Sequence, residues 1–451
     1  MANRITDGSA LLQRLEQDGI EHLWVVYHDY SARGSAKSMP KETFRGTIRD
    51  GVVFAVANLD MTTNDRQATD AKWLADSGDF MAVPDPRSYA VLPRYPKTAR
   101  IHVWMRATDG SVWDGCPRTR LQKVVDELKT EGYSVQAALE PEFYLLNRDE
   151  QGEYRPVNST RMFSQRGLAA EQPFVLAVVD ELRGMGVHVA QIGKEYGPGQ
   201  YEMSVDHADP IQAVDDYFSL KEAVRDVSKQ FGHIATFMPK PYAHYTGSSL
   251  HVHLSLWDQE GKIDLTPGTS DETSLSEVGG HFLGGILKRV DALTGLGSPT
   301  VNSYKRLLPG SWAPANTYWG YGNRSGVVRI PGIGKRRHIE FRSPDNSCQP
   351  YLLLAGLLAA GLDGIRNKIE PPEPFQGDIG HLTPEEIARY NIGFLPRALP
   401  EALGALEADD VIGAALGSTI LEHFLIVKRQ ELAQYNIEVH PWERAMYLEL
   451  V

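Results

Sequence analysis

The sequence predicts a protein of mixed helices and strands, with a small N-terminal unit ahead of a larger one. The 451 residues are enough for two or more domains and a large core. A proline-rich run at 84–96 marks a boundary between two parts. Beyond residue 101, apolar patterns typical of strands and of helices alternate. On pattern alone, this alternation would indicate a doubly wound parallel sheet.

The first hundred residues read as a separate unit. Asp7 can cap a helix that Gly19 ends. Strands are expected over 20–27 and 52–56, with the polar loop 28–37 after the first of them. These short elements predict a small domain rich in strands.

The larger part contains helices with clear start signals. Helices are expected to begin at Pro117, at Pro173 and at Asp209-Pro210, because proline is tolerated in the first turn and aspartate caps it. The apolar run 351–368 predicts a core helix, to which we assign no chemistry.

Bulk properties exclude several kinds of partner. The chain has 58 Asp and Glu against 46 Lys and Arg, and its net charge of -12 disfavours nucleic acid and suits metal cations or a cationic substrate. The longest apolar run, 351–362, is too short to span a bilayer, and we expect no signal peptide because Asp7 and Gly8 interrupt the polar start. Cys116 and Cys348 have no metal-ligand spacing and suggest a reducing compartment. We therefore expect a cytoplasmic protein without a membrane partner.

The most informative stretch is 137–146, which has the composition of a buried strand yet carries two carboxylates. Alternation places Glu140 and Glu142 on one face, with Leu139 and Phe143 on the other. Two such acids repel each other and lose hydration unless cations neutralise them. Taken alone, the stretch fits an exposed strand with two solvated glutamates equally well.

Three further stretches, at 195–204, 247–257 and 338–342, place polar side chains on one strand face and apolar side chains on the other. One such strand means little. Four of them, with five glutamates and a histidine directed the same way, indicate a site. The polar residues singled out in these three stretches are Glu195, Gln200, Glu202, Ser204, His251, His253, Ser255, His338, Glu340 and Arg342.

Together these stretches resemble the glutamine synthetase family, and the resemblance runs through most of the chain. It extends to Thr-Phe-Met-Pro-Lys-Pro at 236–241, Val-Asn-Ser-Tyr-Lys-Arg-Leu-Leu-Pro-Gly at 301–310, Asn-Arg-Ser at 323–325 and Arg-Ile-Pro at 329–331. The resemblance implies an α+β fold with an N-terminal β-grasp domain over residues 1–105. A catalytic domain over 106–451 would follow, with a curved, mostly antiparallel sheet that forms a partial barrel flanked by helices. We follow this implication because pattern cannot determine strand order.

The resemblance also implies two or more divalent cations. Carboxylates and an imidazole form hard, oxygen-rich sites that suit Mg²⁺ or Mn²⁺. Two ions roughly 3.5–4 Å apart can clamp the oxygens of a phosphoryl group in transfer. One ion would be held by Glu142, Glu195 and Glu202, and the other by Glu140, His251 and Glu340.

ATP and L-glutamate are the substrates that the resemblance implies. Arg306 would pair with the α-carboxylate of glutamate beside the loop that contains Gly247. Arg324 and Arg342 would meet the acyl phosphate. The nucleotide site would be formed by His253, Ser255, Arg329 and Lys335. No glycine-rich phosphate-binding motif is present to supply another cradle.

Two features bear on the amine. Asp29 stands where the family places an acid near the amine, on a loop that reaches a neighbouring subunit's active site. The surface-loop interpretation of Asp29 is equally compatible with the sequence. Trp312 replaces the flap glutamate that ammonia-using members associate with deprotonating ammonium. Trp312 therefore favours an organic amine as substrate.

Three functions remain open on the sequence. The first is a ligase of the γ-glutamylpolyamine or γ-glutamylmonoamine branch, which joins the γ-carboxyl of glutamate to a primary organic amine and releases ADP and phosphate. The second is a true glutamine synthetase that uses ammonia, and the third a non-catalytic relative. A homo-oligomer is expected, with the family's double ring of twelve subunits (two stacked hexamers) as its form. The identity of the amine does not follow from the residues.

Overall fold

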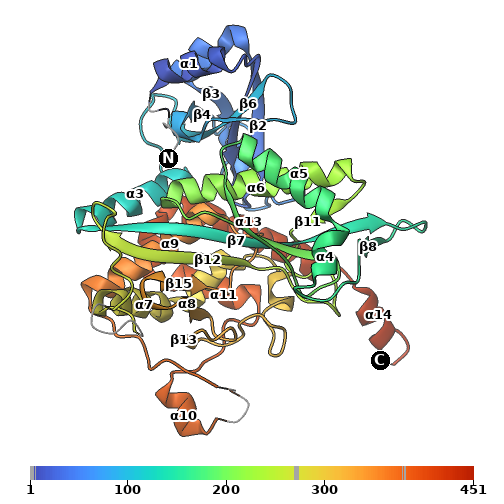
Figure 1. Cartoon of the computed structure of the whole chain (residues 1–451), viewed down its shortest axis with the longest axis vertical. Helices are drawn as coiled ribbons and strands as arrows, with labels where there is room; N and C mark the ends of the chain where they lie inside the picture. The colour runs from blue at the N-terminus through green and yellow to red at the C-terminus, as the bar shows by residue number, and fades with distance from the viewer. Residues whose placement is uncertain (1–4, 6, 269–273, 378, 380–381, 451) are drawn as a thin grey trace.

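The computed structural model describes residues 5, 7–268, 274–377, 379 and 382–450. Its strands form two sheets, a six-stranded sheet in the N-terminal part and a nine-stranded sheet that runs through the middle of the molecule (Figure 1). Both sheets are accompanied by helices, so the mixed fold expected from the sequence is confirmed.

The N-terminal part contains a sheet and two short helices. Its elements are α1 (Gly8–Gln17), β1 (His22–His28), β2 (Gly34–Pro40), α2 (Phe44–Asp50), β3 (Val52–Ala55), β4 (Asp79–Pro84), β5 (Ala90–Val91) and β6 (Thr98–Arg106). The strand order is β2-β1-β6-β4-β3, with β5 beside β6, and only β1 and β6 run parallel. The Asp7 carboxylate accepts hydrogen bonds from the backbone of Ser9 and Ala10, as the capping prediction requires.

The second sheet is built around the long strand β7. Its strands are β7 (Tyr133–Arg148), β8 (Tyr154–Pro156), β9 (Val189–Lys194), β10 (Gln200–Val205), β11 (Ile234–Thr236), β12 (Leu250–Asp258), β13 (Trp319–Tyr321), β14 (Val328–Ile330) and β15 (Ile339–Phe341). The order is β13-β14-β15-β12-β7-β10-β9, and every neighbouring pair except β13–β14 is antiparallel. The doubly wound parallel sheet suggested by pattern alone is therefore wrong, because helices between strands do not fix strand direction. The curved antiparallel sheet implied by the resemblance is confirmed.

Helices surround this sheet, and one of them lies at the centre of the core. The helices are α3 (Pro117–Thr130), α4 (Gln165–Ala170), α5 (Gln172–Gly184), α6 (Pro210–Gln230), α7 (Glu277–Lys288), α8 (Val290–Gly297), α9 (Pro350–Arg366), α10 (Pro384–Arg389), α11 (Leu399–Ala408), α12 (Asp410–Leu416), α13 (Ser418–Asn436) and α14 (Pro441–Tyr447). Helix α9 packs against α3, α7 and α12, which confirms the core helix. A Cβ atom on Gly285 of α7 would lie 2.0 Å from the Ala360 carbonyl oxygen, so this crossing requires glycine.

The hydrophobic core continues from one sheet to the other. Buried Tyr27 and Ile101 from the N-terminal sheet belong to the same cluster as Leu139 of β7 and Leu353 of α9. The domain boundary between residues 105 and 106 therefore stays a prediction. The two parts share buried apolar surface, which couples their stability.

The C-terminal segment projects from the body of the molecule at α14 (Figure 1). Ile437, Trp442 and Leu448 are more than half exposed there, at 80%, 63% and 67%. Within the described part of the chain, no single helix is long and apolar enough to cross a membrane. The segments Asp410–Leu416 and Ser418–Tyr447, which meet at a bend of 101°, are together long and apolar enough to cross one, judged by length and composition only.

A buried ion-pair group ties the N-terminal part to two helices of the larger part. Arg118 donates to Asp85 and to Asp215 at 2.7 Å each, and all three side chains are at most 4% exposed. We expect Arg118→Ala to lower the free energy of unfolding by about 3–5 kcal/mol, because two buried carboxylates lose their shared cation. Urea denaturation followed by circular dichroism measures the change. Lys123→Ala, on the exposed face of the same helix, serves as the control and should cost under about 1 kcal/mol; equal effects of the two changes would contradict the prediction.

Candidate active site

The polar strand faces identified in the sequence lie side by side, because β15, β12, β7 and β10 are consecutive in the sheet. Residues directly opposite each other in neighbouring strands share a face. The strand register therefore gathers the glutamates and histidines on one surface. It pairs Glu340 with His253, Glu140 with His251, and Glu142 with Glu202.

Three of these residues are arranged as ligands of one metal ion. Ligand atoms of Glu140, Glu202 and His251 all lie within 4.8 Å of one another. Ser204 donates to Glu140 Oε2 at 2.8 Å. Burial opposes ionisation of Glu140, but hydrogen bonds from His251 and His253 outweigh it and lower its pKa. This group draws on both of the ligand sets expected from the sequence.

The remaining acids are crowded. Burial, reinforced by the charges of Glu140 and Glu142, raises the pKa of Glu202 to about 11. Burial and the charge of Glu142 raise the pKa of Glu195 to about 7. Such a cluster lacks positive charge, and divalent cations would supply it. The oxygen-rich donor set with one imidazole fits Mg²⁺ or Mn²⁺.

Glu340 has a different environment, between two arginines. Arg329 donates to it at 2.8 Å, and Arg342 forms a second, short ion pair. Burial opposes ionisation, but the Arg342 charge and its neighbours outweigh it and lower the pKa of Glu340 to about 2. Glu340 Oε1 lies 3.8 Å from His251 Nδ1, at the edge of the metal-ligand group.

A pocket of about 250 Å³ opens beside this surface. It brings together residues expected at the metals, at glutamate, at the acyl phosphate and on the flap. The expected residues that line it are Glu142, Glu195, Glu202, Gly247, His251, Arg306, Trp312, Arg324 and Arg342.

The absence of a side chain at Gly247 leaves room for Arg306, which lines this pocket. A Cβ atom on Gly247 would lie 2.4 Å from Arg306 Cγ, so a larger residue there would displace the arginine. The Arg306 guanidinium donates to the carbonyls of Pro344, at 2.8 Å, and Ser343. Its Nε has no protein partner among the described residues. A guanidinium so placed suits a carboxylate ligand.

The residues expected around the nucleotide do not line this pocket. His253 Nδ1 lies 2.9 Å from His338 Nε2, and Ser255 accepts a hydrogen bond from the indole of Trp257 at 2.8 Å. Arg329 is paired with Glu340, as described above. Lys335 belongs to a short 3₁₀ helix, but its side chain lies outside the described part of the chain. The nucleotide roles of these residues stay predictions.

Asp29 also lies away from the pocket. Its carboxylate is 1% exposed and accepts hydrogen bonds from the backbone of Ser31 and Arg33 and from Arg33 Nε at 2.8 Å. Burial raises its pKa. Within one subunit, Asp29 therefore fixes the loop between β1 and β2. Its action in a neighbour's site stays a prediction.

The structure adds apolar residues that the sequence reasoning missed. Met162, Phe163 and Tyr196 line the pocket with Trp312. The Tyr196 and Trp312 ring centroids are 5.1 Å apart. Trp312 has a φ of 63° and is 63% exposed. Only the position of Tyr196 directly after Glu195 carried a signal in the sequence.

Asn346 is a further residue that no pattern indicated. Its side-chain amide donates to the carbonyls of Glu142, at 3.0 Å, and Ser249, at 2.9 Å. The Ser249 amide in turn donates to the Glu142 carboxylate at 2.8 Å. Asn346 therefore ties β7 to the segment that enters β12.

Comparison with known proteins agrees with this geometry. The glutamine synthetase catalytic domain profile matches residues 114–447. The chain is 34% identical to a glutamine synthetase of Halobacterium salinarum, over 99% of this chain and 98% of that protein. It is also 34% identical to a glutamate–methylamine ligase of Methyloversatilis universalis, over 97% and 98%. A solved structure described as a GmaS/ADP complex has a TM-score of 0.86 at 32% identity, with 98% and 100% of the two chains covered.

The fold and the site define a carbon–nitrogen ligase. The chain belongs to the glutamine synthetase family, and the resemblance found in the sequence is confirmed.

Proposed function

We propose that this ligase joins the γ-carboxyl of L-glutamate to a primary organic amine at the expense of ATP. One observation carries the choice of amine. Trp312, packed on Tyr196, stands where ammonia-using relatives are expected to carry the flap glutamate. A broad aromatic surface can lie along an alkyl or aryl chain and stack on a cation. It offers no carboxylate to a small ammonium ion.

The proposed reaction has two steps. A γ-carboxylate oxygen of glutamate attacks the γ-phosphorus of ATP, ADP leaves, and γ-glutamyl phosphate forms. The amine nitrogen then attacks the γ-carbonyl carbon, phosphate leaves, and the nitrogen loses a proton to give the amide. Arg306 would hold the α-carboxylate, and Arg324 and Arg342 would balance charge on the acyl phosphate.

Two or more Mg²⁺ or Mn²⁺ ions complete the proposed site. Bound there, they would neutralise charge on the oxygens of the transferring phosphoryl group. Glu140, Glu202 and His251 would hold one ion, which their mutual proximity supports. Glu142 and Glu195 would serve a second ion together with Glu202, as expected from the sequence.

The amine must lose a proton before attack, since an alkylammonium like that of lysine has a pKa of about 10.4. Trp312 cannot accept this proton. We assign the role to Asp29 from a neighbouring subunit, the acid that the resemblance places near the amine.

An amine panel tests the proposed function. Purified enzyme would receive ATP, Mg²⁺, L-glutamate and one amine at a time, with phosphate release and product mass as readouts. We expect a primary organic amine to give a higher kcat/KM than ammonium. An enzyme that makes glutamine efficiently and ignores every amine offered would instead be a glutamine synthetase, a reading that the name of the Halobacterium salinarum relative favours.

We further propose that the enzyme is a homo-oligomer, with two stacked hexameric rings as its form. The exposed apolar side chains of the C-terminal segment support association, because such surface is normally covered. A cytoplasmic location, without nucleic acid or membrane as partner, also stays a prediction.

Subunit mixing tests whether neighbours share active sites. Asp29→Ala and Arg324→Ala enzymes should each be inactive alone, since each lacks one half of the site. After dissociation and reassembly of an equal mixture, about a quarter of the sites would combine two intact halves and regain activity. Activity of the mixture, measured as phosphate release, checks this. A fully active monomer by light scattering would contradict shared sites.

A further inference from the structure

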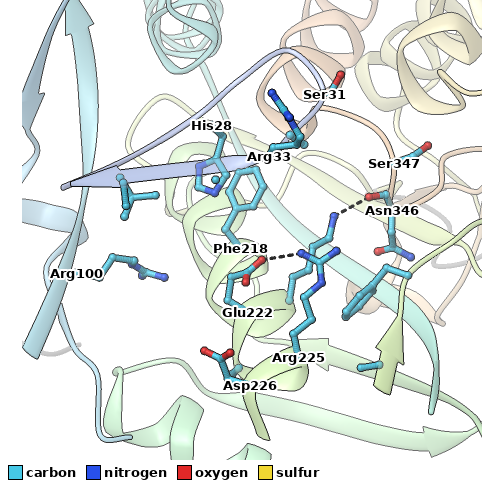
Figure 2. Close-up of a pocket in the computed structure, with 18 of the residues that line it drawn as sticks. His28, Ser31, Arg33, Arg100, Phe218, Glu222, Arg225, Asp226, Asn346 and Ser347 are labelled. Atoms are coloured by element: carbon cyan, nitrogen blue, oxygen red, sulfur yellow. Dashed lines mark hydrogen bonds and ion pairs between the residues drawn. The ribbon is translucent and has the colours of Figure 1, made fainter. Parts of the chain in front are cut away.

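A second cavity, of about 660 Å³, lies between the N-terminal sheet and helix α6 (Figure 2). We call it the interdomain cavity. His28 and Arg100 line it from β1 and β6, and Lys221 lines it from α6. None of the residues that line it also lines the catalytic pocket. Its volume is that of a site for a small molecule.

Two cations at this cavity are buried without a carboxylate partner. Lys221 is 6% exposed, and its Nζ donates to the backbone carbonyl of Asn346 at 2.8 Å. Arg100 is 9% exposed, donates to Ser219 Oγ at 2.9 Å, and has no partner for Nε. Across the described ranges of the chain, neither cation forms an ion pair. Burial, with the nearby Arg225 charge, lowers the pKa of Lys221 to about 8.

The carboxylates at the cavity each form an ion pair with a cation other than Lys221 and Arg100. Figure 2 shows Glu222 bonded to Arg225 rather than to Lys221 or Arg100. The ion pairs of the lining acids are Glu222–Arg225 at 2.9 Å, Asp226–Lys229 at 3.0 Å and Glu181–Arg94 at 3.5 Å. The cavity therefore retains an excess of positive charge.

Histidines add hydrogen-bonding capacity beside the cations. His102 is 1% exposed, and no side chain among the described residues hydrogen-bonds its ring nitrogens. His28 stacks on Phe218 with ring centroids 3.4 Å apart (Figure 2). Burial lowers the pKa of both histidines well below the usual value, so each is neutral and carries one N–H.

We propose that the interdomain cavity binds a small anion through its phosphate or carboxylate group, with Lys221 as the cation that holds it. A buried cation without a counter-ion is unfavourable, and an anionic ligand would remove that cost. The Lys221 ammonium supplies charge-assisted hydrogen bonds, and the positive charge of Arg100, which lines the same cavity, further favours an anion.

Calorimetric titration of the assembled enzyme, without nucleotide, tests the proposal. Inorganic phosphate and succinate are the probes, because they separate the two chemistries. We expect one of the two probes to bind in the interdomain cavity. Lys221→Met should raise the Kd of that probe by at least about tenfold. Lys129→Met, at an exposed position of α3 away from both cavities, is the control and should keep this binding. Anion binding at the catalytic pocket would persist in both variants.

A second measurement uses the unchanged enzyme, so it does not depend on how well a variant folds. Crystals soaked in selenate should give an anomalous peak in the interdomain cavity beside Lys221. A peak only at the catalytic pocket, or a neighbouring subunit's carboxylate in the cavity, would overturn the proposal. So would equal affinities of the unchanged enzyme and Lys221→Met for both probes. None of these readouts depends on which amine is the substrate.

Discussion

Glu142→Ala and Glu202→Gln should each lower kcat for phosphate release by about a thousandfold or more, because the loss of a bound cation removes several kcal/mol of transition-state stabilisation. Both side chains line the catalytic pocket, and Glu202 also belongs to the metal-ligand group. Steady-state kinetics with saturating ATP and glutamate measure the effect. Glu153→Gln, at an exposed turn, is the control and should leave turnover unchanged.

Thermal unfolding distinguishes a lost ligand from a damaged fold. The pKa of Glu202 is raised to about 11, so its ionised form opposes folding at every pH above its ordinary value. Without metal at neutral pH, Glu202→Gln should therefore raise Tm. Added Mg²⁺ should raise Tm of the unchanged enzyme more than that of the variant. Near-normal turnover of both variants at ordinary Mg²⁺ would show that the metal assignment is wrong.

Trp312→Glu should shift the preference from organic amine toward ammonium by about ten- to a hundredfold in the ratio of kcat/KM values. The new carboxylate would attract ammonium and help to deprotonate it, while the apolar surface shared with Tyr196 is lost. Competition assays with both amines present, read by product mass, give the ratio directly.

Trp312→Phe is the matched control, since it keeps an aromatic surface and imposes the same strain at a positive φ. It should keep the preference for the organic amine. Because Trp312 is 63% exposed, neither change should unfold the enzyme. If the ratio of kcat/KM values were unchanged in Trp312→Glu, Trp312 would not determine which amine is preferred.

Much of the local structure could be predicted from the sequence because side-chain alternation has a fixed period. Glu140 and Glu142 share a face while Leu139 and Phe143 are fully buried, as the pattern required. The order of the strands could not be predicted in the same way. Alternation says which residues share a face, but not which strand lies beside which, and the parallel sheet was wrong for that reason.

For the candidate site, too, the residues could be predicted from the sequence but their arrangement in space could not. Its glutamates, histidines and arginines are visible in motifs. The grouping of Glu140 and Glu202 with His251 depends on the register of three strands and could not be predicted from any one of them. Phe163 and Tyr196 meet Trp312 only after loops distant in sequence come together at the pocket.

Asn346 lines the interdomain cavity and also hydrogen-bonds the strands that carry the acidic cluster, and this gives it a thermodynamic role. Its carbonyl accepts from Lys221 in the interdomain cavity, and its amide holds the carbonyls of Glu142 and Ser249 beside the acidic cluster. An anion that draws Lys221 away would remove a hydrogen bond that fixes Asn346. The position of Glu142 would then be less constrained, which would change the affinity of the acidic cluster for cations. Linkage makes such an effect reciprocal: the cation would alter the affinity for the anion by the same factor.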